Sequence, residues 1–559
     1  MNWTAVAPGL AQFRGYRRSW LRGDVLAGLT VAAYLVPQVM AYATVAGVSP
    51  LAGLWAALLP LAIYAVLGTS RVLSAGPEST TALITATALA PLAAGNSGRY
   101  TALAAMLAVL VGVICLVAGL VRLGFIADLL ARPVLVGYMS GVAVIMVGSQ
   151  LGKLTGIPVT GDGFVQQVRS LASGVRQVHW PTVVFSAAVL AVLLLLAWWR
   201  PRAPGPFIAM LLATGVVVVF SLDHQGIKVV GEVPAGLPAF GLVGIPLHEM
   251  GTLAAAAIGV AIVAFSDTVL TARTFAAREG GYIDSNAELR ALGMCNVGAG
   301  FTHGFPVSSS ASRTALANLV GGRSQLYSLV TLALLLIVML TARDLLTRFP
   351  TAALGALVVY AALRLIDIGE YRRLARFRRS ELILAILTTV AVLGFGVLGG
   401  ILAATGLSIL DLLRRVARPH DSVLGFVPGV AGMHDLHDYA DAQPEPGLLM
   451  YRYDAPLFFA NAEDFRARAM AAVDDNPEPV RWFVLNSEAN VDVDLTALDA
   501  MDQLRQDLNR RGIVFGMARV KVPLRKALEA AGLLDKIGAD HIFATLPTAV
   551  HAYRSRPTA

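Results

Sequence analysis

The chain has 559 residues, of which 56% are hydrophobic and only 14% are charged. Because soluble proteins carry about 25% charged residues, this composition excludes an ordinary soluble enzyme and predicts a helical membrane protein with many spans. The net charge of +8 does not indicate a nucleic-acid partner, since the arginines lie at the ends of apolar segments, where membrane orientation explains them.

Apolar segments follow a basic N-terminal stretch, residues 1–23, and recur as far as residue 418. They predict a mainly α transport domain over residues 24–418. Fourteen spans are expected near residues 24–46, 50–68, 76–94, 100–121, 133–152, 180–199, 205–221, 250–275, 285–301, 309–321, 325–345, 351–367, 380–396 and 398–417. Between the fifth and sixth spans, residues 164–178 have helical apolar spacing and predict an interfacial helix.

The distribution of arginine predicts the orientation of these spans. If residues 1–23 are cytoplasmic, the arginine-rich loops all face the cytoplasm, as the positive-inside rule requires. These loops are residues 122–132, 200–202, 273–290 and 364–379. The spans divide into two repeats of seven, at about residues 24–221 and 250–418. A repeat with an odd number of spans must be followed by an inverted copy, an arrangement typical of alternating-access transporters.

The composition changes after the last span. Residues 419–446 are rich in Pro, Gly, His and Asp and are predicted to be a linker. Residues 447–559 alternate strand-like and helical patterns, which predicts a small α/β domain. Strands are expected at residues 448–453, 456–460, 481–486 and 513–518, and Asn461 is expected to cap a helix. Because the preceding span ends in two arginines, we expect this domain in the cytoplasm.

Two hydrophobic segments, residues 70–86 and 305–325, are interrupted in the same way. Each has an extended lead-in, a group of small hydroxyl residues and a short helix. Paired broken helices of this kind predict a substrate site near the bilayer midplane, and free N–H groups at their N-termini favour an anion. The alternative is that the small residues only permit close helix packing. The predicted anion-binding residues of these segments are Gly76, Pro77, Ser79, Ser312 and Arg313.

Three charged residues are expected at membrane depth. Arg313 costs about 2.5–3.5 kcal/mol to insert, so it should face a cavity or pair with Asp267 or Glu78. Asp267 and Thr271 are four residues apart and share a helix face, where they could hold Na⁺ or where the carboxylate could carry a proton. Glu78 at the first half-helix could cap it, point away from the pocket, or titrate during transport.

The first span contains Pro37, which is expected to kink it. Gln38 and Tyr42 are four residues apart, so both could line the pocket. The alternative is that they pack against a neighbouring span.

With these pieces together, the chain resembles the sulfate permease (SulP) family of anion transporters. The resemblance rests on DVLAGLTVAAYLVPQVMAYATVAGVSPLAGLWAA at residues 24–57, SRVLSAGPESTTAL at 70–83, FSDTVLTARTFAAREG at 265–280 and GFPVSSSASRTALANLVGGRSQL at 304–326. The C-terminal domain resembles the STAS domain. The resemblance implies two inverted seven-span repeats, split into a core and a gate domain, commonly as a dimer.

The resemblance also implies roles for single residues. Arg313 matches a position where relatives carry an arginine beside the substrate, and Gln38 and Tyr42 match a glutamine and an aromatic residue. At Asp267, bicarbonate members bind Na⁺ together with a threonine, and plant sulfate members use a carboxylate for protons. Thr496 matches the phosphorylatable position of STAS antagonists, although Leu495 replaces their usual hydroxyl residue. The alternative is that Thr496 caps a helix.

We therefore expect a secondary transporter for inorganic anions, with sulfate as the first candidate, driven by H⁺ or Na⁺. The alternatives are a bicarbonate or other anion transporter or exchanger, a nucleobase permease of the same architecture, and a membrane anion sensor that signals through the STAS domain. No cofactor beyond a co-transported ion, no enzymatic activity and no metal site other than a possible Na⁺ site at Asp267 and Thr271 are expected. The expected location is the plasma membrane, with cytoplasmic termini, and the expected state is a homodimer.

Overall fold

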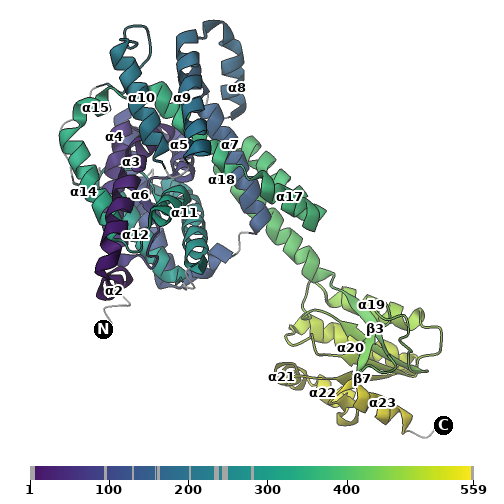
Figure 1. The fold of residues 1–559 in the computed structure, drawn as a ribbon. Coiled ribbons are helices and arrows are strands. Elements are labelled where there is room, and N and C mark those ends of the chain that lie inside the picture. Colours follow the sequence, from purple (N-terminus) through teal and green to yellow (C-terminus); the bar gives the residue numbers. More distant parts are fainter. Residues whose placement is uncertain are drawn as a thin grey trace. The chain divides into compact units, whose positions relative to one another are not determined.

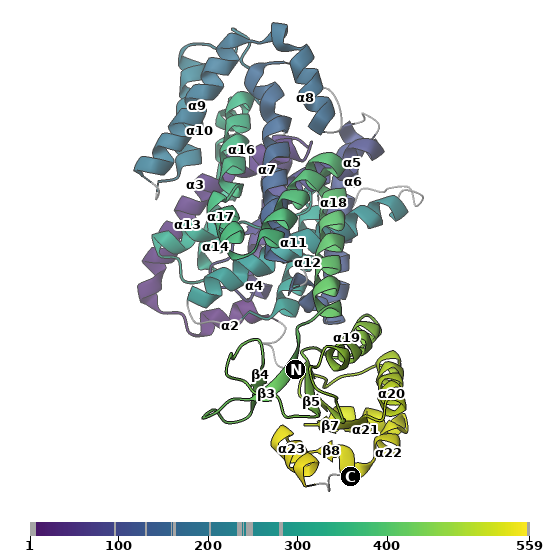
Figure 2. The ribbon, with the colours of Figure 1, turned by 90° about the vertical axis from the view of Figure 1, so that its right-hand side faces the viewer.

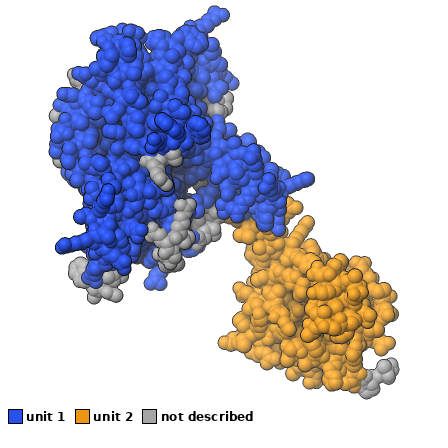
Figure 3. Space-filling model, viewed as in Figure 1, with its two compact units in different colours: residues 1–408 blue, residues 409–559 orange. Residues whose placement is uncertain are grey.

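The computed structural model describes residues 7–93, 97–128, 131–157, 159, 164–200, 203–231, 238, 240–241, 250–278 and 283–555 (Figure 1). The chain divides into two compact units, residues 1–408 and residues 409–559 (Figure 3). The first unit is helical, and the second contains an extended β-sheet.

The helices of the first unit occupy all the predicted spans and several segments outside them. They are α2 (Pro8–Arg14), α3 (Leu21–Val45), α4 (Pro50–Leu67), α5 (Ser79–Ala93), α6 (Ser97–Leu120), α7 (Arg132–Thr155), α8 (Phe164–Ser173), α9 (Trp180–Trp199), α10 (Gly205–Val219), α11 (Met250–Arg278), α12 (Ser285–Phe301), α13 (Ala311–Val320), α14 (Leu326–Thr341), α15 (Arg343–Thr347), α16 (Thr351–Leu365), α17 (Ile368–Phe377) and α18 (Arg379–Ala417). Among the described residues, eight helices are long and apolar enough to cross a membrane, judged by length and composition.

The two predicted broken segments are short helices preceded by extended chain. Strand β1 (Ala75–Gly76) leads into α5, and strand β2 (Ser308–Ser309) leads into α13. Helix α13 ends at Gly321, whose φ of 102° is accessible to glycine at little cost. The predicted thirteenth and fourteenth spans form one assigned helix, α18, which is interrupted at Gly396 with φ 76° and ψ 176°.

Close helix contacts hold the short segments in place. A Cβ atom on Gly112 of α6 would lie only 2.6 Å from the Gly293 carbonyl oxygen of α12, so these backbones touch directly. In the same region, the buried Asn296 of α12 donates to the Val307 carbonyl oxygen at 2.9 Å and accepts from the Val307 N–H at 2.9 Å. The chain entering β2 is therefore fixed by a side chain of α12.

The second unit is built on a six-stranded sheet in the order β4–β3–β5–β6–β7–β8. Its strands are β3 (Asp421–Phe426), β4 (Met433–Asp435), β5 (Leu448–Tyr453), β6 (Trp482–Asn486), β7 (Val514–Ala518) and β8 (Ile542–Phe543). Strand β3 pairs antiparallel with β4 and β5, whereas β5 to β8 are parallel. Parallel neighbours require helical crossovers, which the α/β pattern of the sequence predicted.

Alternating side chains of β5 divide the apolar core of this unit between the two sheet faces. Leu449, Tyr451 and Tyr453 join the larger cluster, and Leu448 and Met450 join the smaller one, as the two-residue period of a strand dictates. The larger cluster includes residues of α19 (Ala462–Asp474), α20 (Leu495–Arg510), α21 (Val522–Ala530) and α22 (Leu533–Ile537). The smaller one includes α23 (Leu546–Arg554).

Three predictions for the second unit need correction. The predicted linker, residues 419–446, contributes β3 and β4 to the sheet, so it is part of the folded unit. The predicted strand 456–460 is only a single bridge from Leu457 to Val493, followed by a turn. Asn461 precedes α19, but its side chain does not cap it; the amide donates to the carbonyls of Pro456 and Val416 instead.

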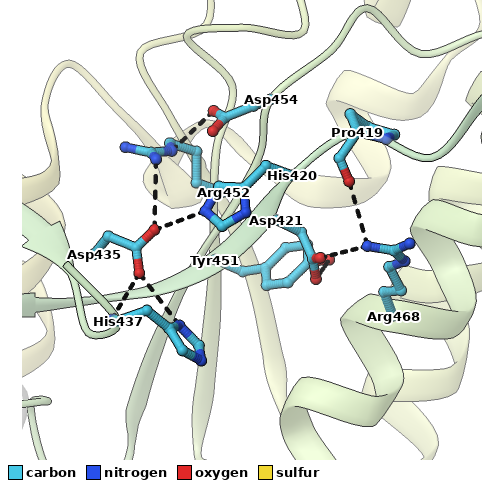
Figure 4. A network of polar contacts seen from close by, with 9 residues as sticks. All are labelled: Pro419, His420, Asp421, Asp435, His437, Tyr451, Arg452, Asp454 and Arg468. Carbon is cyan, nitrogen blue, oxygen red and sulfur yellow. Dashed lines mark hydrogen bonds and ion pairs between the residues drawn. The ribbon is translucent and has the colours of Figure 1, made fainter. Parts of the chain in front are cut away.

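A polar network joins the first strands of the second unit (Figure 4). The buried carboxylate of Asp435 lies 2.9 Å from His420 Nε2 and accepts from the His437 N–H at 2.9 Å. Burial alone would raise the pKa of Asp435, but the hydrogen bonds from His420 and the His437 N–H outweigh it and lower that pKa to about 2. The hydrogen bond to Asp435 raises the pKa of His420. The β3–β4 hairpin is thus fixed by the contact between Asp435 and His420.

Replacing Asp435 with Asn is expected to lower the local stability of the β3–β4 hairpin by about 1–3 kcal/mol, because a buried acceptor of several hydrogen bonds is lost. The stabilisation by ionised Asp435 is present above its unfolded pKa of about 3.9 and is lost as the pH falls through about 2. The stabilisation by protonated His420 is present below about pH 6.5 and is lost as the pH rises through its raised pKa.

Hydrogen exchange of the β3 and β4 amides in the full chain checks this prediction. In the unmodified protein, the protection of these amides from exchange should be greatest between about pH 4 and 6.5. The Asp435→Asn variant should show no such maximum. Asp438→Asn, at an exposed position in the turn after β4, is the matched control. A variant with unchanged protection across this range would contradict the role given to the pair.

Candidate anion site

The two broken segments meet through their strands. β1 pairs antiparallel with β2, with Ala75 opposite Ser309 and Gly76 opposite Ser308. The Ser310 N–H donates to the Ser74 carbonyl oxygen at 2.9 Å, and the Ser74 N–H donates to Thr314 Oγ1 at 3.0 Å. Because each strand runs directly into a helix, the pairing brings the N-termini of α5 and α13 to one place. Both helix dipoles then favour negative charge there.

The side chain of Arg313 connects the two broken segments by hydrogen bonds. Its side chain is completely buried, and it donates from Nε to Ser74 Oγ at 3.1 Å and from Nη1 to the Pro77 carbonyl oxygen at 3.0 Å. Nη1 also donates to Gln38 Oε1 at 3.0 Å. These acceptors are all neutral, so the alternative of an ion pair with Asp267 or Glu78 is not what the structure shows. Among the described residues, therefore, no carboxylate forms an ion pair with Arg313.

A cavity of about 390 Å³ lies beside this junction. It is lined by seven of the predicted site residues: Gln38, Tyr42, Glu78, Ser79, Asp267, Thr271 and Ser312. Gly76, Pro77 and Arg313 are not among the residues that line it. A Cβ atom on Gly76 would lie 3.4 Å from Arg313 Nη2, so the glycine leaves room for the guanidinium.

Gln38 connects Arg313 to the cavity. Its Oε1 accepts from Arg313, which leaves the Nε2 amino group to donate to the Tyr42 hydroxyl at 2.9 Å. Both residues come from α3, which continues as a helix through Pro37. The arginine therefore orients the amide so that its donor side faces Tyr42 and the cavity. An N–H donor and a phenol are suitable partners for an anion.

Asp267 and Thr271 project into the cavity from one face of α11, as their spacing predicted. The Asp267 carboxylate lies near the Ser308 hydroxyl of β2 and interacts electrostatically with Glu78 of the other segment. A carboxylate and a hydroxyl next to an anion pocket could bind Na⁺ or carry a proton. Their position allows charge on Asp267 to influence an anion in the cavity.

Glu78 caps α5. Its Oε2 accepts from the Thr80 N–H at 2.7 Å, and its Oε1 accepts from the Ser79 hydroxyl at 2.5 Å. Both carboxylate oxygens are therefore occupied by groups of its own helix. The expectation that Glu78 points away from the pocket is only partly met, because the residue also lines the cavity.

The Glu78→Gln variant is expected to retain uptake with unchanged pH dependence, because the Glu78 side chain serves as a helix cap whose oxygens are bonded within α5. Loss of one cap acceptor should lower stability by about 0.5–2 kcal/mol. Uptake by reconstituted protein across pH 5–8, together with thermal unfolding, checks both expectations. Thr87→Val, in the same helix but outside the cavity lining, is the control. Loss of the pH dependence in the Gln variant would show instead that Glu78 titrates during transport.

Several residues that line the cavity were not predicted from the sequence, among them Tyr34, Thr80, Ser309 and Arg364. Tyr34 lies one helical turn before Gln38, and the same-face rule could have found it. Arg364 lies in the last turn of α16 and was assigned only to the arginine-rich loop. It is exposed and lines the cavity, where it adds a second positive charge.

Thr496 lies outside this site, in the second unit. It is exposed in the first turn of α20, which begins at Leu495. The residue that caps the helix is Asp494, whose side chain accepts from the Ala497 N–H at 2.8 Å. The alternative that Thr496 is the cap is therefore wrong, and its phosphorylation stays a prediction.

Comparisons with known proteins agree with this architecture. The sulfate permease family matches residues 21–388, and the STAS domain matches residues 439–549. Two probable sulfate transporters of Mycobacterium tuberculosis strains are 66% identical over 550 residues, which cover 98% of this chain and 98% of each relative. The chain belongs to the sulfate permease family. It is a multi-pass membrane protein of a family of anion transporters, not of enzymes.

A third relative in sequence and two solved structures of the same fold are also similar to this chain. Probable sulfate transporter 4.2 of Arabidopsis thaliana is 30% identical, over 99% of this chain and 85% of the relative. The structure of SLC26A9 superimposes with a TM-score of 0.91 at 21% identity, covering 99% of this chain and 93% of that one. The transmembrane domain of the cyanobacterial bicarbonate transporter BicA matches 70% of this chain and 98% of that one, with a TM-score of 0.62 at 24% identity. The predicted fold class, a helical transmembrane core followed by a STAS domain, is confirmed.

Proposed function

We propose that this sulfate permease takes up sulfate by symport with H⁺ or Na⁺. The anion is held between the N-termini of α5 and α13, and Asp267 and Thr271 hold the coupling cation. The observation that carries the proposal is the β1–β2 pairing. It brings two positive helix ends next to one cavity, together with a buried arginine that forms no ion pair with any described carboxylate. We propose sulfate as the substrate, and not another anion, because two relatives that are 66% identical to this chain are named as probable sulfate transporters.

Coupling to a cation follows from the energetics of uptake. Moving a divalent anion inward against a negative-inside potential costs about 4.6 kcal/mol per 100 mV. One monovalent cation entering with sulfate would halve this cost, and two would cancel it. Alternating access then requires the part that carries both half-helices to move, by rocking or as an elevator, against the rest of the transport domain.

The proposal includes location and assembly. We propose that the protein is a homodimer in the plasma membrane, with the N-terminus and the STAS domain in the cytoplasm. The arginine distribution supports this orientation, because the loops that it predicts as cytoplasmic contain most of the arginines between the spans.

Competitive uptake tests the proposal directly. Labelled sulfate is offered to proteoliposomes that contain the full chain, with bicarbonate as competitor and with Na⁺ and pH varied independently. Accumulation above equilibrium that follows the H⁺ or Na⁺ gradient is expected. Accumulation of bicarbonate but not of sulfate would show that bicarbonate is the substrate and would leave the proposed mechanism unchanged. Binding of sulfate without accumulation would instead favour a sensor that signals through the STAS domain.

A further inference from the structure

A second cavity, of about 570 Å³, lies in the first unit away from the site described above. Its lining includes Lys153 near the end of α7, Lys228 in the chain after α10, and His179 before α9. The whole sequence has only five lysines, and the other three are Lys521, Lys526 and Lys536 in the second unit. Two of five lysines thus line one cavity of the transport domain.

The two cavities lie toward opposite ends of the same helices. The first cavity contacts Met139 on α7 and Arg364 on α16, whereas the second contacts Lys153 on α7 and Thr351 on α16. At 1.5 Å per residue, these positions are separated by about 20 Å along each helix. With the orientation proposed above, the second cavity opens at the extracellular face. Figure 2 shows α8, α9 and α10 together at one end of the first unit.

The walls of the second cavity are built by close backbone contacts. A Cβ atom on Gly156, whose φ is 77°, would lie 2.8 Å from His179 Cβ, and one on Gly226, whose φ is 95°, would lie 3.2 Å from His179 Cε1. His179 is also held through Nδ1, 2.7 Å from Thr182 Oγ1. The Thr351 N–H donates to the Lys228 carbonyl oxygen at 2.9 Å, which fixes the Lys228 backbone to the start of α16.

The charge of this cavity suits an anion. Among the described residues that line it, none is acidic, and none of the ion pairs found in the described part of the chain involves Lys153 or Lys228. Lys153 is partly buried, so its charge is screened less by water than that of an exposed lysine. The N-terminus of α16 adds a positive dipole.

We propose that Lys153 and Lys228 form an outer binding site for inorganic oxyanions, which captures sulfate before it reaches the site between α5 and α13. The identity of the anion rests on the proposed function; the existence of an anion site does not. Ammonium groups that line the same concave surface attract anions and raise their local concentration. Lysine, with a hydrated and flexible ammonium group, suits a site that must also release its ligand.

Chemical labelling tests this site without requiring transport. The full chain in nanodiscs is treated with an amine-reactive ester, with and without sodium sulfate, and the labelled peptides are quantified by mass spectrometry. Sulfate is expected to reduce labelling of Lys153 and Lys228 by about fivefold, as a charge-dependent contact would. The three lysines of the second unit are internal controls and should not change. Equal protection by gluconate at matched ionic strength, or no protection, would overturn the proposal.

Uptake kinetics give a second measurement. The double variant Lys153→Gln with Lys228→Gln is expected to raise KM for sulfate by about fivefold and to leave kcat nearly unchanged, while Lys153→Arg with Lys228→Arg restores KM. Lys521→Gln with Lys526→Gln is the matched control. A KM equal to that of this control would overturn the capture role. If the unmodified protein accumulates no sulfate, the proposed function fails, and the labelling result still decides whether the outer site exists.

Discussion

Replacing Arg313 with Gln is expected to reduce sulfate uptake by at least about 100-fold, equivalent to about 2.8 kcal/mol. The variant removes a buried positive charge and leaves the acceptors on Ser74, Pro77 and Gln38 without their donor. Gln38 then loses the contact that orients its amide toward Tyr42. The variant should therefore bind the anion more weakly, and the shape of its pocket should change.

Variants of neighbouring groups separate these two effects. Arg313→Lys keeps the charge but lacks the planar fork that reaches several acceptors, so uptake should recover only in part, to within about tenfold of the unmodified protein. Gln38→Leu keeps the arginine and removes the connection to Tyr42; it should raise KM. Arg348→Gln, at an exposed position after α15, is the control for loss of an arginine. Initial rates of labelled sulfate uptake, normalised to monodisperse protein, provide the measurement.

A folded Arg313→Gln protein with normal KM and rate would contradict the site. Folding must be checked independently, because loss of a fully buried donor group can also destabilise the junction between the segments. Thermal unfolding of the detergent-solubilised protein serves this purpose. The Lys variant keeps the test informative if the Gln variant does not fold.

Replacing Asp267 with Asn is expected to abolish concentrative uptake, with at least about a tenfold loss of gradient-driven accumulation, while exchange of sulfate for sulfate persists. The amide cannot accept a proton and binds Na⁺ poorly, so the coupling cation loses its main partner. The cavity keeps its helix ends and Arg313, so anion binding should survive. Parallel measurements of net uptake and of exchange in proteoliposomes check this split.

Thr271→Val distinguishes the two cations. If Na⁺ is coupled, loss of the hydroxyl should raise the Na⁺ concentration needed for half-maximal uptake by about tenfold, because one oxygen ligand is gone. If H⁺ is coupled, the same variant should leave the pH dependence unchanged. Asp344→Asn, on the exposed helix α15, controls for loss of a carboxylate. Unimpaired accumulation by Asp267→Asn would show that coupling resides elsewhere.

Much of the site could be predicted from local features of the chain. The apolar segments predicted the helices, and the interruptions before Ser79 and Ala311 predicted the two short ones, because proline, glycine and hydroxyl residues disfavour a continuous helix at those points. The four-residue spacing of Asp267 and Thr271 placed both on one face of α11, where they line the cavity. These features depend on neighbours within a few turns, so the sequence contains them directly.

Features that depend on distant segments could not be predicted in the same way. The predicted linker became two strands because β5 offers a free edge to Asp421–Phe426, which the composition of residues 419–446 does not show. Arg364 lines the cavity because α16 lies against it, although its sequence context resembles an ordinary cytoplasmic loop. Such placements follow from which elements pack together, and local patterns do not encode that packing.

By itself the sequence determined that this protein is a helical membrane transporter with two broken segments suited to an anion. The tertiary structure decided how those segments meet and what Arg313 contacts. Its guanidinium bonds Ser74, 239 residues away along the chain, and neutral acceptors take the place of the expected carboxylate. The physical reason is that the partners of a buried charge are set by the pairing of β1 with β2, which only the folded chain brings about.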